Sequence, residues 1–206
     1  MTPPRLSSTT SQRVFDTLLR SLAEPGTIRF LPVDYPEVEP ALALALALAD
    51  VGVIVNVDDD PDHPWSQAVA EATGATVGPV GSASIVISTS PTPALFERVA
   101  VGDPLTPEDG ARVALAVAGL ATGPAAGHVV VELRGPGVPG RRVLAIDGPG
   151  PEVVGRLGTG SGPFPTGFDT WLFARDGSVV GVPRSTTVDL VADGNEPVNG
   201  ATPWAM

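Results

Sequence analysis

Apolar residues recur at helical spacing near the start of the chain. Four of them share one stripe of a helix, at positions i, i+3, i+4 and i+7: Phe15, Leu18, Leu19 and Leu22. The pattern predicts an amphipathic helix over residues 11–26, with Thr10 or Ser11 as its N-cap. Pro25-Gly26 should end it, because the residue before a proline avoids the α conformation.

Four more stretches predict helices. Residues 41–50, ALALALALAD, alternate like a strand, but alanine and leucine are strong helix formers and no β-branched residue is present. We therefore predict a helix that is apolar nearly all round, and hence buried. Residues 92–99 begin with a Thr-Pro pair that suits a helix start. A short helix is expected at 66–73, and 152–157 has a weaker helical pattern.

Short runs rich in valine and isoleucine predict strands. They span 27–31, 51–57, 84–88, 128–133, 141–146, 169–174, 178–183 and 185–190. The last three should form a meander, with its first turn at Asp176-Gly177. Residues 106–120 are ambiguous. Their Thr-Pro-Glu-Asp start resembles a capping box, but Gly110 interrupts it and alternation follows, so a strand is favoured.

These elements predict a single α/β domain over residues 11–190, with a mixed, partly antiparallel sheet flanked by helices. A chain of 206 residues suits one domain. Residues 1–10 are expected to be a flexible N-terminus. Residues 191–206 hold turn formers without periodicity and are expected to be a flexible tail.

The composition excludes several kinds of chemistry. The chain has no cysteine, and its 12 basic residues are all arginines, so it has no lysine. Thiol nucleophiles and cysteine-ligated metals are excluded, as are a lysine Schiff base and a Walker A loop. A net charge of −11 argues against nucleic acid and anionic membranes as partners. No transmembrane run and no secretory leader is visible, so we expect a cytoplasmic protein.

Two motifs resemble ligand-binding sites but support that interpretation only weakly. The run GPGVPG at 135–140 fits a dinucleotide fingerprint, but its prolines remove N–H donors and a strand follows, so we interpret it as a turn. Asp58, Asp59, Asp60, Asp62 and His63 follow a buried strand. They fit either a Mg²⁺ site or a solvated acidic loop, and the loop is favoured. We therefore predict no metal. His128 is expected to be structural.

The stretch PRSTT at 183–187 places an arginine before three hydroxyls. A guanidinium suits phosphate or carboxylate oxygens. On a strand, Arg184 and Thr186 would face one side together. Asp169, which ends PFPTGFD at 163–169, is a possible orienting partner. Two interpretations stay open: an anion site formed by these residues, or the polar face of a strand. No catalytic residue is identified.

The two stretches PFPTGFDTWLF and VVGVPRSTTVDL resemble the C-terminal part of the H subunit of the bacterial carbon–phosphorus lyase core complex, the PhnH family. Three earlier stretches are also similar to that family: FDTLLRSLAEPGTI (15–28), GDPLTPEDGA (102–111) and LRGPGV (133–138). They follow the family's order from about residue 11 to 190. The resemblance implies a fold similar to the large domain of pyridoxal-phosphate transferases, without the cofactor. The missing lysine agrees, and no cofactor is expected.

The resemblance also implies a place in phosphonate breakdown. In that assembly the G, H, I and L subunits are associated with displacing adenine from ATP by an alkylphosphonate, giving an alkylphosphonate ribose triphosphate. A different, cysteine-bearing subunit cleaves the carbon–phosphorus bond. Our first hypothesis is an accessory, homodimeric subunit of this multi-subunit transferase. It would dock the G, I and J subunits, with a phosphonate or nucleotide as a candidate ligand. The alternative is a free-standing Mg²⁺-dependent phosphotransferase or hydrolase that uses the acidic run at 58–62.

Overall fold

A mixed β-sheet forms the centre of the computed structural model, which describes residues 5–32, 38–58 and 65–191. Within those residues, seven strands lie in the order β1-β10-β9-β5-β4-β2-β3. The strands from β3 to β9 run parallel to their neighbours, whereas β9, β10 and β1 pair antiparallel. Their bounds are β1 Arg29–Phe30, β2 Ile54–Asp58, β3 Thr76–Val77, β4 Ile85–Ser88, β5 Arg112–Val117, β9 Asp169–Ala174 and β10 Ser178–Val182.

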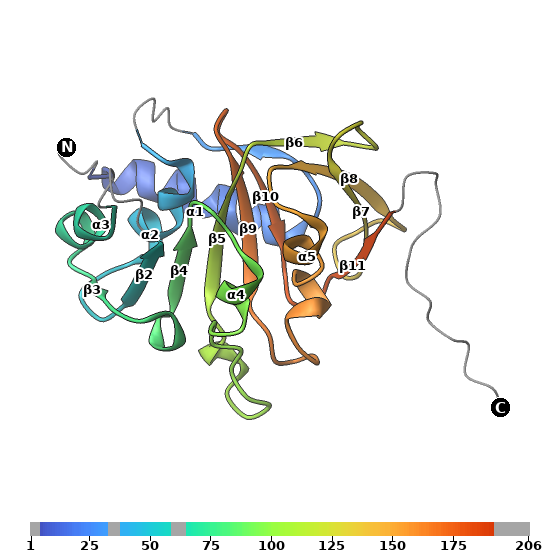
Figure 1. The fold of residues 1–206 in the computed structure, drawn as a ribbon. Helices are drawn as coiled ribbons and strands as arrows, with labels where there is room; N and C mark the ends of the chain where they lie inside the picture. Colours follow the sequence, from blue (N-terminus) through green and yellow to red (C-terminus); the bar gives the residue numbers. More distant parts are fainter. Residues whose placement is uncertain (1–4, 33–37, 59–64, 192–206) are drawn as a thin grey trace.

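A second, antiparallel sheet lies beside the first, at the right of Figure 1. Its four described strands have the order β11-β7-β8-β6. Their bounds are β6 Gly119–Thr122, β7 Val129–Arg134, β8 Arg142–Asp147 and β11 Thr187–Leu190. Three of these strands lie in the connection between β5 and β9, and β11 follows β10. The small sheet is therefore formed by segments that connect or follow strands of the large sheet.

The large sheet divides the hydrophobic core into two layers. One core cluster lies between the large sheet and the helices α1, α2 and α3. The other lies between the opposite face of that sheet, the small sheet and the helices α4 and α5 (Figure 1). The helices are α1 Ser8–Ala23, α2 Ala43–Leu48, α3 Trp65–Thr73, α4 Pro93–Phe96 and α5 Pro151–Val154. Short 3-10 turns lie at Pro40–Leu42, Val80–Ser82, Pro107–Asp109 and Gly158–Ser161. In the part of the chain that is described, no helix has the length and apolar character needed to cross a bilayer.

Most predicted elements are confirmed. The buried Ala-Leu helix is present as a 3-10 turn followed by α2, and its first residues are fully buried. The ambiguous stretch contains the strand β5, preceded by the 3-10 turn at Pro107–Asp109. The first helix begins three residues earlier than predicted. Its N-cap is Ser7, whose hydroxyl accepts a hydrogen bond from Thr10 N at 3.2 Å, so the predicted caps were wrong.

The predicted C-terminal meander is only half right. The β9–β10 hairpin forms, with Val179 opposite Phe173 and Val182 opposite Thr170. The third strand does not pair with β10. It pairs with β7 in the small sheet, where Asp189 lies opposite Glu132. Of the predicted tail at 191–206, only Val191 is described, and its N donates to Val130 O at 2.9 Å. Residues 192–206 lie outside the described residues, as do residues 1–4 of the predicted flexible N-terminus.

Candidate functional site

The two C-terminal stretches that resemble the phosphonate family meet at one edge of the large sheet. PFPTGFD leads into β9, and PRSTT follows β10. Because β9 and β10 are antiparallel neighbours, the start of β9 and the end of β10 lie side by side. The loop before β5 joins them there, since Gly167 N donates to Val101 O at 2.8 Å and Asp169 N donates to Ala111 O at 3.2 Å.

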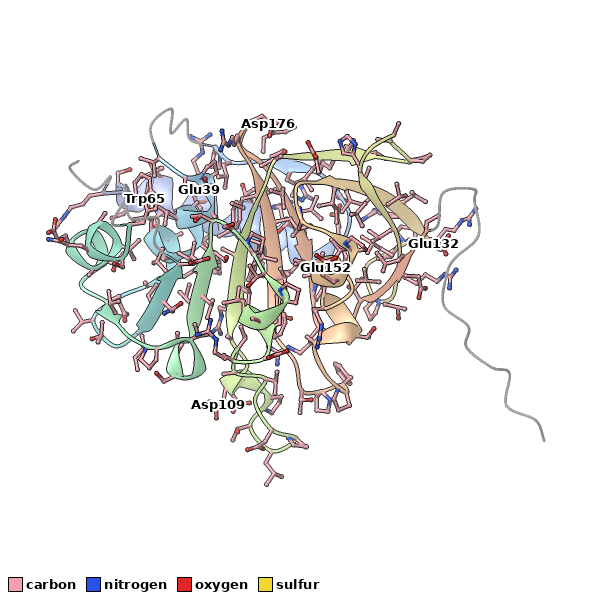
Figure 2. The ribbon with its side chains drawn as sticks, viewed as in Figure 1. Glu39, Trp65, Asp109, Glu132, Glu152 and Asp176 are labelled. Atoms are coloured by element: carbon pink, nitrogen blue, oxygen red, sulfur yellow. The ribbon has the colours of Figure 1, made fainter. Side chains whose placement is uncertain are left out.

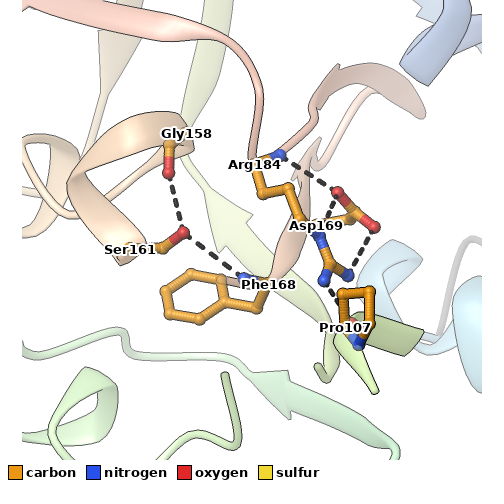
Figure 3. A network of polar contacts seen from close by, with 6 residues as sticks. All are labelled: Pro107, Gly158, Ser161, Phe168, Asp169 and Arg184. Atoms are coloured by element: carbon orange, nitrogen blue, oxygen red, sulfur yellow. Dashed lines mark hydrogen bonds and ion pairs between the residues drawn. The ribbon is translucent and has the colours of Figure 1, made fainter. Parts of the chain in front are cut away.

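Arg184 ties these three segments together, as Figure 3 shows. Its Nε and Nη2 donate to Asp169 Oδ1 and Oδ2 at 3.3 and 3.0 Å, and its backbone N donates to Oδ1 at 3.0 Å. Its Nη1 donates to the carbonyl oxygen of Pro107 at 2.5 Å. The side chains of Arg184 and Asp169 are only 14% and 25% exposed. A guanidinium has five N–H groups, and three of them already bond to the chain itself.

Glycines allow the three segments to approach this closely. An ideal Cβ at Gly110 would lie 2.2 Å from Gly167 O and 2.8 Å from Arg184 Nη1. Gly167 itself has a φ of +121°, and its Cβ would lie 2.5 Å from Ser161 Oγ. Side chains at these positions would push the loops apart, so the glycine of the stretch GDPLTPEDGA that precedes β5 allows close packing here.

Thr186 lies in a turn and not on a strand, so the predicted side-by-side alternation with Arg184 was wrong. Its backbone N donates to Pro183 O at 2.9 Å, and its carbonyl oxygen accepts from Thr159 N at 2.8 Å. The side chain is fully buried, and its Oγ1 has no hydrogen-bond partner among the described residues. The structure thus brings Arg184 and Asp169 together but gives Thr186 no hydrogen bond to either.

Sequence reasoning missed other members of this network. Ser161 Oγ donates to Gly158 O at 2.7 Å and accepts from Phe168 N at 3.3 Å. The Phe168 ring stacks on Phe96, with 5.6 Å between ring centroids. Ser161 belongs to none of the quoted motifs, and the carbonyl of Pro107 carries no signal in a sequence. Phe168 lies within a quoted stretch and could have been expected to pack in the core.

Two loops project beyond this network, and Asp109 in Figure 2 marks the base of one of them. Leu105 and Phe164, one on each loop, are exposed apolar side chains. Asp103 shapes the first loop, because its Oδ1 accepts from Leu105 N and Thr106 N at 2.7 and 3.0 Å. These backbone hydrogen bonds lower the pKa of Asp103 below its ordinary value.

The acidic run at 58–62 gains no support as a metal site. Asp58 lies at the end of β2, where its Oδ2 accepts from Ser88 Oγ at 2.9 Å. The other acidic residues of the run and His63 lie outside the described residues. In the described ranges no group of three or more possible ligands gathers around a metal position. His128 Nδ1 lies 2.9 Å from Ala126 O in the turn before β7, and its structural role stays a prediction.

A second polar cluster lies on the small sheet, where Figure 2 labels Glu132. Glu132 is buried, and its carboxylate accepts from Arg134 Nη2 and, at 2.8 Å, from Arg141 Nη1. In addition, Arg134 Nη1 lies 3.5 Å from Asp189 Oδ2 on the neighbouring strand β11. Burial raises the pKa of Glu132, but the hydrogen bonds and positive charges of Arg141 and Arg134 outweigh it. The net pKa is below the ordinary value of 4.5.

The lowered pKa of Glu132 predicts a pH-dependent contribution to stability. A carboxylate with a depressed folded-state pKa stabilises the fold above its unfolded pKa and loses that contribution as the pH falls through the folded value. The difference in unfolding free energy between the wild type and Glu132→Gln should therefore be largest near pH 7 and shrink below pH 4.5. Urea denaturation at several pH values measures it. A difference that stays constant down to pH 3 would contradict the assignment.

The sequence of the chain was also compared with known protein families. The family described as "Bacterial phosphonate metabolism protein (PhnH)" matches residues 6–189, which include every segment of the Arg184 network. The chain belongs to the PhnH family. A search of curated proteins finds no match. Membership of this family places the chain in bacterial phosphonate metabolism.

Proposed function

We propose that this PhnH-family chain is an accessory subunit of the carbon–phosphorus lyase core complex. It supports the transfer of an alkylphosphonate onto the ribose of ATP with release of adenine, and it acts by contact with other subunits. The proposal includes G, I and J subunits as partners, a homodimeric state and a cytoplasmic location. It also includes a distant relation to the large domain of pyridoxal-phosphate transferases. Without lysine or cysteine, the chain lacks the two side chains best suited to amine and thiol covalent catalysis.

The occupied guanidinium of Arg184 is the observation that carries this proposal. An arginine that recognises a ligand anion usually offers a bidentate pair of free N–H groups. Here Asp169 and Pro107 take that pair, and little of the side chain is exposed. Arg184 and Asp169 therefore act, in this proposal, as positioning residues that hold the family's loops in shape for partners. Anion contact at Arg184, Thr186 and Asp169 stays a prediction.

Titration of the purified chain tests both parts of this proposal. Methylphosphonate, ATP and inorganic phosphate are each titrated calorimetrically, and assembly with purified G, I and J subunits is followed in parallel. We expect assembly, and no binding of the three small molecules to the chain alone. If the chain binds methylphosphonate, ATP or phosphate, and Arg184→Met abolishes this binding, Arg184 would be part of an anion site. Conversion of a phosphonate or a nucleotide by the solitary chain at enzymatic rates would overturn the accessory role.

A further inference from the structure

An apolar groove of about 420 Å³ opens between α1, α2 and the amino ends of the parallel strands. Trp171 and Ile85 are buried at the groove, whereas Phe15 and Leu19 of α1 line it with 46% and 54% of their surface exposed. The indole N–H of Trp171 already donates to Leu18 O at 3.1 Å, so the ring offers the groove an apolar surface. The groove lies on the α1 side of the large sheet, and none of its lining residues belongs to the Arg184 network.

One charged group lines this groove, and it has no partner in the part of the chain that the structure describes. Arg112 begins β5, and its exposed guanidinium makes no hydrogen bond or ion pair with any described residue. Ser84 lies next to it, since Arg112 N donates to Ser84 O at 2.9 Å, and Ser84 also lines the groove. The lining contains no carboxylate from the described residues. Arginine is enriched in binding hot spots, and an exposed apolar surface with a polar rim marks an interaction site.

The exposure and charge of the groove indicate its occupant. Phe15 and Leu19 lie one turn apart on α1, so the groove stays open along the helix, whereas small-molecule pockets enclose most of their ligand. A second copy of this chain would present the same surface in a two-fold dimer. That surface, as far as the chain is described, offers no carboxylate, so Arg112 would stay unpaired.

We propose that the groove docks an apolar segment of another core-complex subunit, and that a carboxylate on this segment pairs with Arg112. This inference rests on the proposed accessory function, because it takes the occupant from the same assembly. Apolar side chains of the segment would cover Phe15, Leu19 and Trp171, and the acidic side chain would fix its register. A charge at the edge of an apolar contact supplies specificity in this way.

Binding to a purified subcomplex of the G, I and J subunits tests the groove. Arg112→Glu and Leu19→Asp should each weaken binding by about 10-fold or more, because one reverses the charge and the other places a charge in the apolar contact. Arg112→Lys should retain most of the affinity. Arg98→Glu and Val77→Asp are matched controls on exposed residues that do not line the groove, and they should bind like the wild type. Unchanged melting temperatures show that the variants fold.

The outcomes separate this inference from the proposed function. Wild-type affinity in both groove variants would overturn the groove and leave the accessory role intact. A change from dimer to monomer in Arg112→Glu or Leu19→Asp, measured by light scattering without other subunits, would assign the groove to self-association and overturn the inference. A wild-type chain that binds none of the subunits would overturn the accessory role and the groove together.

Discussion

Replacing Asp169 by alanine should lower the free energy of unfolding by about 2–3 kcal/mol. The change removes the carboxylate that accepts from the backbone N, Nε and Nη2 of Arg184. It leaves a guanidinium that is only 14% exposed with a single partner, the carbonyl of Pro107. A charge in that position is costly, because water replaces the lost carboxylate only in part. Urea denaturation followed by circular dichroism measures the change.

Asp16→Ala is the matched control. Asp16 also pairs with an arginine, since Arg20 Nε donates to its Oδ2 at 2.8 Å, but these side chains are 57% and 61% exposed. An exposed pair of this kind contributes at most about 0.5 kcal/mol. If Asp169→Ala proved no more destabilising than Asp16→Ala, the Arg184 network would have no special part in holding the fold.

Gly137→Ala should destabilise the chain by about 3 kcal/mol or more. Gly137 lies in the Gly-Pro-Gly turn after β7, and its φ is +78°, a conformation that costs an alanine about 1 kcal/mol. In addition, a Cβ there would lie 2.1 Å from the carbonyl oxygen of Ala23, the last residue of α1. Backbone atoms cannot move aside cheaply, so the end of α1 must shift or the turn must open. Thermal unfolding and urea denaturation both measure the loss.

Gly140→Ala isolates the effect of that close approach. Gly140 lies three residues later in the same turn with a φ of +70°, and nothing lies within 4 Å of its ideal Cβ. The free energy of unfolding of Gly140→Ala should therefore fall only by the cost of the left-handed backbone conformation, about 1 kcal/mol. Equal losses in the two variants would show that contact with α1 has no role. The turn would then have no part in holding α1.

Local signals predicted much of the fold. The β9–β10 hairpin follows from Asp176-Gly177, because Asp176 Oδ1 accepts from Ser178 N at 2.9 Å and Gly177 adopts a φ of +81°. Alanine and leucine propensity correctly outweighed strict alternation in the stretch that contains α2. Each of these features depends on residues within a few positions of one another, which a single sequence displays directly.

Pairing between distant strands could not be predicted in the same way. STTVDL has the composition of a strand, and β11 forms, but nothing in its residues specifies β7 as its neighbour. Pro183 did carry a usable signal, since a proline has no backbone N–H to donate and interrupts a strand. The bond from Thr186 N to Pro183 O closes that turn and removes Thr186 from the strand. Arg184 and Thr186 were expected to face the same side because side chains alternate along a strand, but the strand begins only at Thr187.

The first helix shows another limit of periodicity. Its four-residue stripe indicates the apolar face correctly, yet of these four residues only Leu18 is fully buried. Phe15 and Leu19 stay half-exposed at the groove beside Arg112. The spacing of apolar residues identifies the face that must be covered, but it does not tell whether the same chain or a partner covers it. This difference is visible only when the helix is placed on the sheet.

The central claim is that Arg184 stabilises the fold by pairing with Asp169 and does not bind an external anion. A double-mutant cycle between Arg184 and Asp169 tests this claim most directly. Unfolding free energies are measured for the wild type, Arg184→Met, Asp169→Ala and the double variant, without any added ligand. The account predicts a coupling energy of about 1.5 kcal/mol or more. A coupling below about 0.5 kcal/mol, the level of an exposed ion pair, would contradict it and return Arg184 to the candidates for binding an external anion.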